Sequence, residues 1–113
     1  MTKYSYQIHQ YTNNLGEIYD EQGKWYNQLD SCENNIIKKL NGKNFQKELY
    51  DNYEVSCYLD IYIITDDCIT EEQEETYNYY YMKDRYKIIK KIEKLVFYCG
   101  FEKPICIENF VIL

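Results

Sequence analysis

The segment 53–65 (YEVSCYLDIYIIT) constrains the fold of this chain more than any other. It is rich in β-branched and aromatic residues, which favour the pleated, half-buried surface of a strand. Because side chains alternate along a strand, apolar residues share one face, whereas Tyr58, Asp60 and Tyr62 share the other. The segment therefore predicts a strand with one face in the core and a second face of aromatic and acidic character.

Other segments predict strands because they alternate polar and apolar residues or are rich in β-branched and aromatic types. The segment TYNYYYM fits either a strand that pairs with 53–65 or the first turns of a helix. The strand is favoured because Tyr is a poor helix former and a good strand former. The expected strands are 3–10, 76–82, 105–112 and, as a small hairpin, 17–20 with 24–27.

Three segments predict helices. In the first, Asp30 and Glu33 resemble a capping box, and an Asn-Gly pair marks the helix end. A shorter helix is expected at 44–51. The last is expected at 84–99, where the apolar residues fall in an arc of roughly 120° and lysines lie opposite. The residues of that arc are Arg85, Ile88, Ile89, Ile92, Leu95, Val96 and Cys99.

The order of these elements predicts the fold class. Strand, helix, strand, strand, helix, strand is the order of the ferredoxin-like split βαβ unit. We therefore expect a single α+β domain over 1–113: an antiparallel sheet with two helices on one face and an extra N-terminal hairpin. The other face of the sheet would be left open.

Bulk composition is that of a globular, acidic chain. Hydrophobic residues make up 45% of it, and 19 acidic against 13 basic residues give a net charge of −6. This balance disfavours non-specific binding to nucleic-acid phosphate and favours a basic partner surface. The first residues lack the apolar core of a signal peptide, and the five cysteines are an odd number. We therefore expect a cytoplasmic protein with reduced thiols and no membrane contact.

No motif for catalysis, metal binding or cofactor binding stands out. The only histidine is His9, on the polar face of a predicted strand, where a solvated side chain is expected. The cysteines lack the short paired spacing of zinc sites, so they are expected to pack in the core. The four glycines stand alone, which disfavours a phosphate-binding loop. The sequence thus predicts a protein that is not an enzyme and needs no metal or cofactor.

Tyrosine is the commonest residue, with 15 Tyr against 4 Phe. Tyr combines a large apolar ring with a polar tip and is enriched at interfaces. The segment 66–75 adds six acidic residues without a basic one, which would attract a basic surface and raise association rates. We therefore predict a partner-binding surface formed by Tyr58, Asp60, Tyr62, Asp66, Asp67, Glu71, Glu72, Glu74 and Glu75.

Alternatives to this protein-binding surface remain open. The segment 12–29 could fold across the open sheet face, so that the tyrosines become half-buried cover. The face could instead stack RNA bases as an RRM does, helped by the lysines of 84–99, although TYNYYYM lacks the glycine of the RRM pattern. The apolar strand 105–112 could also pair with a second copy as an exposed edge.

In size, acidity and its Tyr-, Asn- and Ile-rich composition, the chain resembles small phage-encoded inhibitors of bacterial defence, anti-CRISPR proteins in particular. It is also similar to immunity proteins that neutralise nuclease toxins. The resemblance implies stoichiometric inhibition of a nucleic-acid-handling enzyme such as a CRISPR effector. In such a mechanism, a compact acidic domain covers a basic nucleic-acid-binding or catalytic surface.

Overall fold

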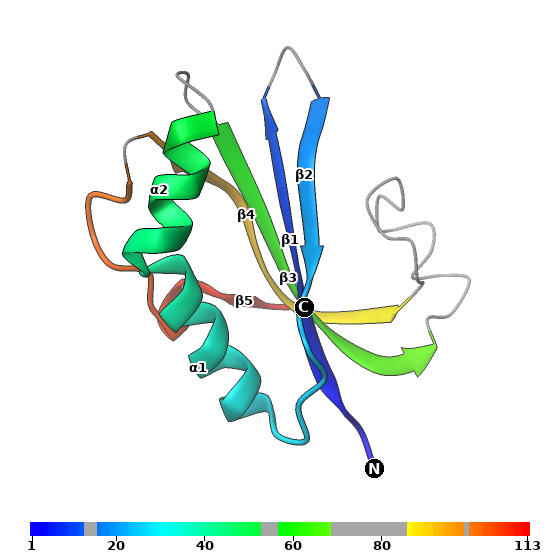
Figure 1. Ribbon diagram of the computed structural model, residues 1–113. Coiled ribbons are helices and arrows are strands. Elements are labelled where there is room, and N and C mark those ends of the chain that lie inside the picture. The colour runs from blue at the N-terminus through cyan, green and yellow to red at the C-terminus, as the bar shows by residue number, and fades with distance from the viewer. Residues whose placement is uncertain (13–15, 53–56, 69–85, 99) are drawn as a thin grey trace.

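The computed structural model describes residues 1–12, 16–52, 57–68, 86–98 and 100–113. In this part of the chain, one antiparallel sheet of five strands carries two helices on the same face (Figure 1). The elements are β1 (Tyr4–Thr12), β2 (Gly16–Gln22), α1 (Leu29–Leu40), α2 (Lys43–Asn52), β3 (Cys57–Cys68), β4 (Tyr86–Phe97), a 3₁₀ turn (Ile107–Asn109) and β5 (Val111–Ile112).

The α+β class and the antiparallel sheet with two helices are confirmed. The strands follow the order β2-β1-β3-β4-β5, and every neighbouring pair is antiparallel. β1 and β3 lie side by side, from Tyr4 opposite Thr65 to Tyr11 opposite Tyr58. A split βαβ unit would place another strand between the two strands that flank its helix. The strand order expected from the sequence is therefore not confirmed.

The main core lies between the helices and the facing side of the sheet. Ile8 of β1 and Leu59 of β3 are fully buried there, against Ile36 and Leu40 of α1. Alternation along β3 brings its apolar residues into this core, as the pattern of 53–65 predicts. Residues 53–56 of that segment lie outside the described part of the chain. Hydrophobic burial of this kind is the main force holding the two layers together.

Both helices form close to where the sequence predicts them, but the first begins differently. Gln28 is the N-cap of α1 and makes no side-chain cap hydrogen bond, while Asp30 lies inside the first turn. The expected capping box is therefore wrong. Asn41 ends the helix, and its side chain accepts from the Ile105 backbone N–H at 2.8 Å and donates to the Ile105 carbonyl at 2.7 Å. This pair of bonds holds the C-terminal segment against the helices.

β4 corrects the predicted helix at 84–99, since residues 86–97 form a strand. Two irregularities in its pairing with β3 explain the error. Ile89 is an extra residue between the pairs Ile63–Lys90 and Ile64–Ile88, and a second shift follows Ile92. The bulges change the alternation of two into a spacing of three between core-facing residues, which resembles a helical pattern. Those core-facing residues are Ile89, Ile92 and Leu95.

The two ends of the sheet also differ from expectation. The N-terminal hairpin pairs β1 with β2, whereas 17–20 and 24–27 were expected to pair with each other. Tyr26 instead makes an isolated bridge to Tyr4. At the other edge, β5 comprises only Val111–Ile112 and pairs with two residues of β4, so the strand expected over 105–112 is much shorter. The predicted strand 76–82 lies outside the described residues.

Candidate functional site

The face of the sheet turned away from the helices carries the Tyr and Asp residues of the predicted site. Antiparallel register places Gln7 beside Tyr62, His9 beside Asp60, and Tyr11 beside Tyr58. Residues directly opposite in an antiparallel pair share a face. β2 extends this sheet at its edge. Trp25, in the connection after β2, packs beside Tyr62 on this face, so within the described residues the alternative that 12–29 covers the tyrosines applies to Tyr62.

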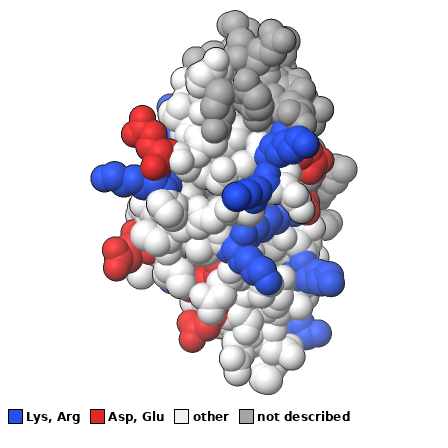
Figure 2. Space-filling model, turned by 60° about the vertical axis from the view of Figure 1, so that its left-hand side comes forward, with Lys and Arg blue, Asp and Glu red and all other residues white. Residues whose placement is uncertain are grey.

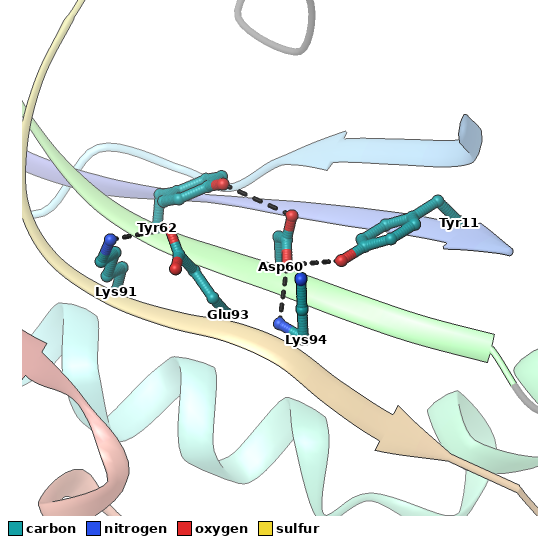
Figure 3. A network of polar contacts seen from close by, with 6 residues as sticks. All are labelled: Tyr11, Asp60, Tyr62, Lys91, Glu93 and Lys94. Carbon is teal, nitrogen blue, oxygen red and sulfur yellow. Dashed lines mark hydrogen bonds and ion pairs between the residues drawn. The ribbon is translucent and has the colours of Figure 1, made fainter. Parts of the chain in front are cut away.

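Asp60 is the centre of a hydrogen-bond network on this face (Figure 3). Its carboxylate accepts the backbone N–H of Lys94 at 2.8 Å, the Tyr11 hydroxyl at 3.3 Å and the Tyr62 hydroxyl at 3.5 Å. The residue is only 8% exposed. A buried carboxylate is tolerated when donors surround it, and here the donors come from three strands. The predicted contact of Asp60 with a partner stays a prediction, and its carboxylate is already bonded within the sheet.

The sheet geometry explains why an acid stands at this position. Between the pairs Leu59–Leu95 and Ile61–Ile92, the single residue Asp60 lies opposite Glu93 and Lys94. This is a β-bulge, and Lys94 takes a left-handed backbone conformation with φ of 53°. Such a conformation costs a residue with a side chain about 1–2 kcal/mol. The Asp60 carboxylate offsets part of this cost because it satisfies the N–H of the bulged residue.

Tyr62 joins this network to a second, smaller core on the same face. Ile64 and Ile88 are buried there, and Trp25 and Tyr86 pack around them together with Tyr62. The Trp25 and Tyr86 rings meet edge to face with centroids 5.0 Å apart. Burial and the neighbouring Asp60 carboxylate raise the pKa of Tyr62 well above its usual value. Its hydroxyl therefore keeps its proton at neutral pH and can donate to Asp60.

Tyr58 belongs to an aromatic and apolar row that crosses three strands. It lies between Tyr11 of β1 and Val96 of β4 in the sheet register. The Tyr11 and Tyr58 rings stack with centroids 5.6 Å apart and an interplanar angle of 28°. Both tyrosines are half-buried, and Val96 is 57% exposed. We name Tyr11, Tyr58 and Val96 the aromatic row; it is the part of this face with the chemistry of a protein-contact anchor.

The predicted acidic residues lie apart from the aromatic row. Asp66 and Asp67 are exposed near the other end of β3, about 20 Å from Asp60 along an extended strand. Asp66 accepts the backbone N–H of Lys3 at 2.9 Å, and Asp67 accepts the Thr65 hydroxyl at 3.2 Å. Glu71, Glu72, Glu74 and Glu75 lie outside the described residues.

Sequence reasoning missed several members of this face. His9 is 2% exposed, with its Nε2 atom 3.2 Å from the Gln7 Oε1 atom and its ring 5.7 Å from that of Tyr62. The expectation of a solvated histidine is therefore wrong. Tyr11 continues the alternation of β1 and could have been found by extending the predicted strand. The bulge residue Lys94 could not, because its segment has a helical pattern.

The three donors to the Asp60 carboxylate hold this side chain within the sheet's own hydrogen-bond network. Within the described ranges, no three or more His, Cys, Asp or Glu side chains gather in a way that could hold a metal ion. None of the helices in the described part of the chain has the length and apolar character that a membrane span requires.

Comparison of the chain with protein-family models, with curated proteins and with solved structures gave no match.

The Asp60 network makes a testable stability prediction. Replacing Asp60 with Ala should lower the free energy of unfolding by about 2–3 kcal/mol, because it removes a charged acceptor and leaves a buried backbone N–H without its partner. Asp60→Asn keeps one oxygen acceptor and should cost less. Urea denaturation of both variants would measure the difference. Equal stability of Asp60→Ala and the parent protein would contradict this role.

Proposed function

We propose that this protein is a non-catalytic binding protein that inhibits a nucleic-acid-handling enzyme, such as a CRISPR effector, by covering a basic surface on it. The observation that carries the proposal is the aromatic row of Tyr11, Tyr58 and Val96. It combines two stacked tyrosines with an exposed aliphatic side chain on a rigid sheet. Tyr is enriched among the few residues that dominate binding energy in protein interfaces.

The net negative charge of the chain supports a partner with a basic surface. The chain carries a net charge of −6, and exposed carboxylates at Asp66 and Asp67 lie at the far end of the strand that holds Tyr58. Acidic groups at the rim of an interface mainly accelerate association with a positive surface, while buried anchors set the lifetime of the complex. The acidic residues and the aromatic row would therefore have separate kinetic effects.

The class of partner rests on charge and on the likeness in size and composition to anti-CRISPR and immunity proteins. Enzymes that handle nucleic acid present basic channels to the phosphate backbone. An acidic domain can occupy such a channel without chemistry of its own. Because the net charge is modest, specific contacts through the aromatic row are more plausible than imitation of a regular phosphate lattice.

The first experiment is a pull-down with the tagged full chain from a bacterial lysate, with and without nuclease treatment, read by mass spectrometry. A stoichiometric nucleic-acid-handling protein that survives nuclease would support the proposal. Recovery of RNA alone, or of proteins that disappear after nuclease treatment, would overturn it in favour of RNA binding.

With the captured partner, Tyr58→Ala should raise the dissociation rate by about tenfold or more, because truncating a Tyr anchor typically removes more than 1 kcal/mol of binding energy. Biolayer interferometry would measure the rate. Tyr58→Phe retains the stacked ring and should bind nearly as well as the parent chain.

Asp30→Asn is a matched charge control for Asp66→Asn, since Asp30 is also exposed but lies on α1 across the molecule. Only Asp66→Asn should slow association at low salt. If Tyr58→Ala binds as the parent chain does while remaining folded by circular dichroism, the aromatic row is not the contact surface.

A further inference from the structure

A groove lies on the helix side of the molecule, away from the aromatic row. Its volume is about 420 Å³, which is within the range of small-molecule sites. It runs between β1, the connection after β2, and the corner where α1 meets α2. The residues that line it are Tyr6, Tyr26, Asn35, Lys38, Lys39, Gly42, Asn44 and Phe45.

The corner end of the groove is electropositive. α2 begins at Lys43, and its first-turn N–H groups, at Lys43, Asn44 and Phe45, have no acceptor among the described residues. Such groups and the helix dipole favour an anion at a helix N-terminus. Lys38 is exposed beside them and makes no ion pair within the described ranges. Figure 2, which turns the helix side forward, shows Lys side chains gathered on this side of an otherwise acidic protein.

The one described carboxylate that pairs with a groove lysine is that of Glu21. It forms an ion pair with Lys39, whose ammonium group also lies 5.6 Å from the centre of the Phe45 ring. Glu21 therefore neutralises Lys39. Lys38 and the first turn of α2 remain as the positive groups at this end.

The second observation is a buried hydroxyl on the groove wall. Tyr6 is 7% exposed and lines the groove, and its hydroxyl has no hydrogen-bond partner among the described residues. Burial, followed by the Glu21 carboxylate, raises the pKa of Tyr6 to about 12. The hydroxyl is therefore protonated at neutral pH and available as a donor. Buried polar groups are nearly always satisfied, so an unused donor here points to a ligand.

We propose that this groove binds a phosphomonoester of small size. Its phosphate lies at the start of α2 beside Lys38, its organic body lies along Tyr26 and Phe45, and a polar atom of that body accepts from the Tyr6 hydroxyl. Aromatic walls with a few convergent polar groups are the usual composition of such sites. This inference does not depend on the sheet face, so it stands apart from the proposed inhibitory function.

The test is an NMR titration of the ¹⁵N-labelled full chain with AMP, phenyl phosphate and inorganic phosphate. AMP should shift the backbone amides of Lys43, Asn44 and Phe45 and should bind at least several-fold more tightly than inorganic phosphate. Absence of these shifts at millimolar AMP would overturn the proposal. Equal affinity for AMP and inorganic phosphate would also overturn it, because the organic body would then make no contact.

Four variants sharpen the result. Lys38→Gln should weaken AMP binding about tenfold, whereas Lys47→Gln, at an exposed lysine of α2 outside the groove lining, should leave it unchanged. Tyr6→Phe keeps the ring and removes only the hydroxyl, so it should weaken AMP but not inorganic phosphate. Equal losses in Lys38→Gln and Lys47→Gln would indicate non-specific charge attraction and would contradict the site. Tyr58→Ala should bind AMP as the parent chain does, which separates this test from that of the proposed function.

Discussion

Replacing Lys90 with Met is expected to lower the free energy of unfolding by about 3–5 kcal/mol, the usual cost of removing one partner from a buried ion pair. The Lys90 Nζ atom lies 2.9 Å from the Glu33 Oε1 atom, and the Glu33 side chain is only 4% exposed. This pair joins β4 to α1 through the main core. Without Lys90, the Glu33 carboxylate would stay buried with no counter-charge. Urea denaturation followed by circular dichroism would measure the loss.

The neighbouring lysine of the same strand is a matched control. Lys91 pairs with Glu93 at 2.7 Å, but both side chains are considerably more exposed. Exposed pairs contribute about 0–1 kcal/mol, so Lys91→Met should be nearly neutral. The double variant Lys90→Met with Glu33→Leu should recover most of the loss, because no charge is then left buried. Equal effects of Lys90→Met and Lys91→Met would show that burial does not decide the strength of these pairs.

The two elements that the Lys90–Glu33 pair joins differ in how well the sequence predicts them: α1 is predicted as a helix, whereas β4 is not predicted as a strand. The apolar spacing of Ile36 and Leu40 predicts α1, and the alternation of β3 predicts a strand, because each pattern depends only on neighbouring residues. The local pattern does not predict β4 as a strand, because its bulges place Ile89 and Ile92 on the core side at a spacing of three. A bulge is set by pairing with another strand, so a local period cannot reveal it.

The sequence also predicts only part of the candidate site. The sequence places Tyr58 and Tyr62 on one face correctly, since alternation alone decides it. The sequence could not predict that the Asp60 carboxylate is engaged in hydrogen bonds on that face. The main donor to this carboxylate is the backbone N–H of Lys94, in a segment whose apolar pattern predicts a helix. Our proposed contact surface therefore centres on the aromatic row, in which Val96 of that same strand is the exposed residue.

Replacing Gly23 with Ala is expected to lower the free energy of unfolding by about 3 kcal/mol, at the upper end of the usual cost of overpacking a filled site. Gly23 follows β2 and donates its backbone N–H to the Tyr6 carbonyl at 2.9 Å. A Cβ atom there would lie 2.5 Å from the Tyr6 Cδ1 atom and closer still to Cε1 and Cζ. Because the ring is buried in the main core, it cannot move aside without disturbing its neighbours. Thermal and urea denaturation would both detect the loss.

Two further variants, one at Gly42 and one at Tyr6, test whether the clash with the Tyr6 ring causes this loss. At Gly42 the nearest atoms to an added Cβ are the Lys39 and Lys38 carbonyl oxygens, at 3.2 and 3.3 Å, so Gly42→Ala needs only a small adjustment and should cost much less. In a Tyr6→Leu background the ring is gone, so adding Gly23→Ala should cost under about 1 kcal/mol. If Gly23→Ala is as harmful in that background as in the parent chain, the clash with the ring is not the cause. The ring over Gly23 also forms one wall of the groove, so Gly23→Ala should weaken AMP binding together with stability.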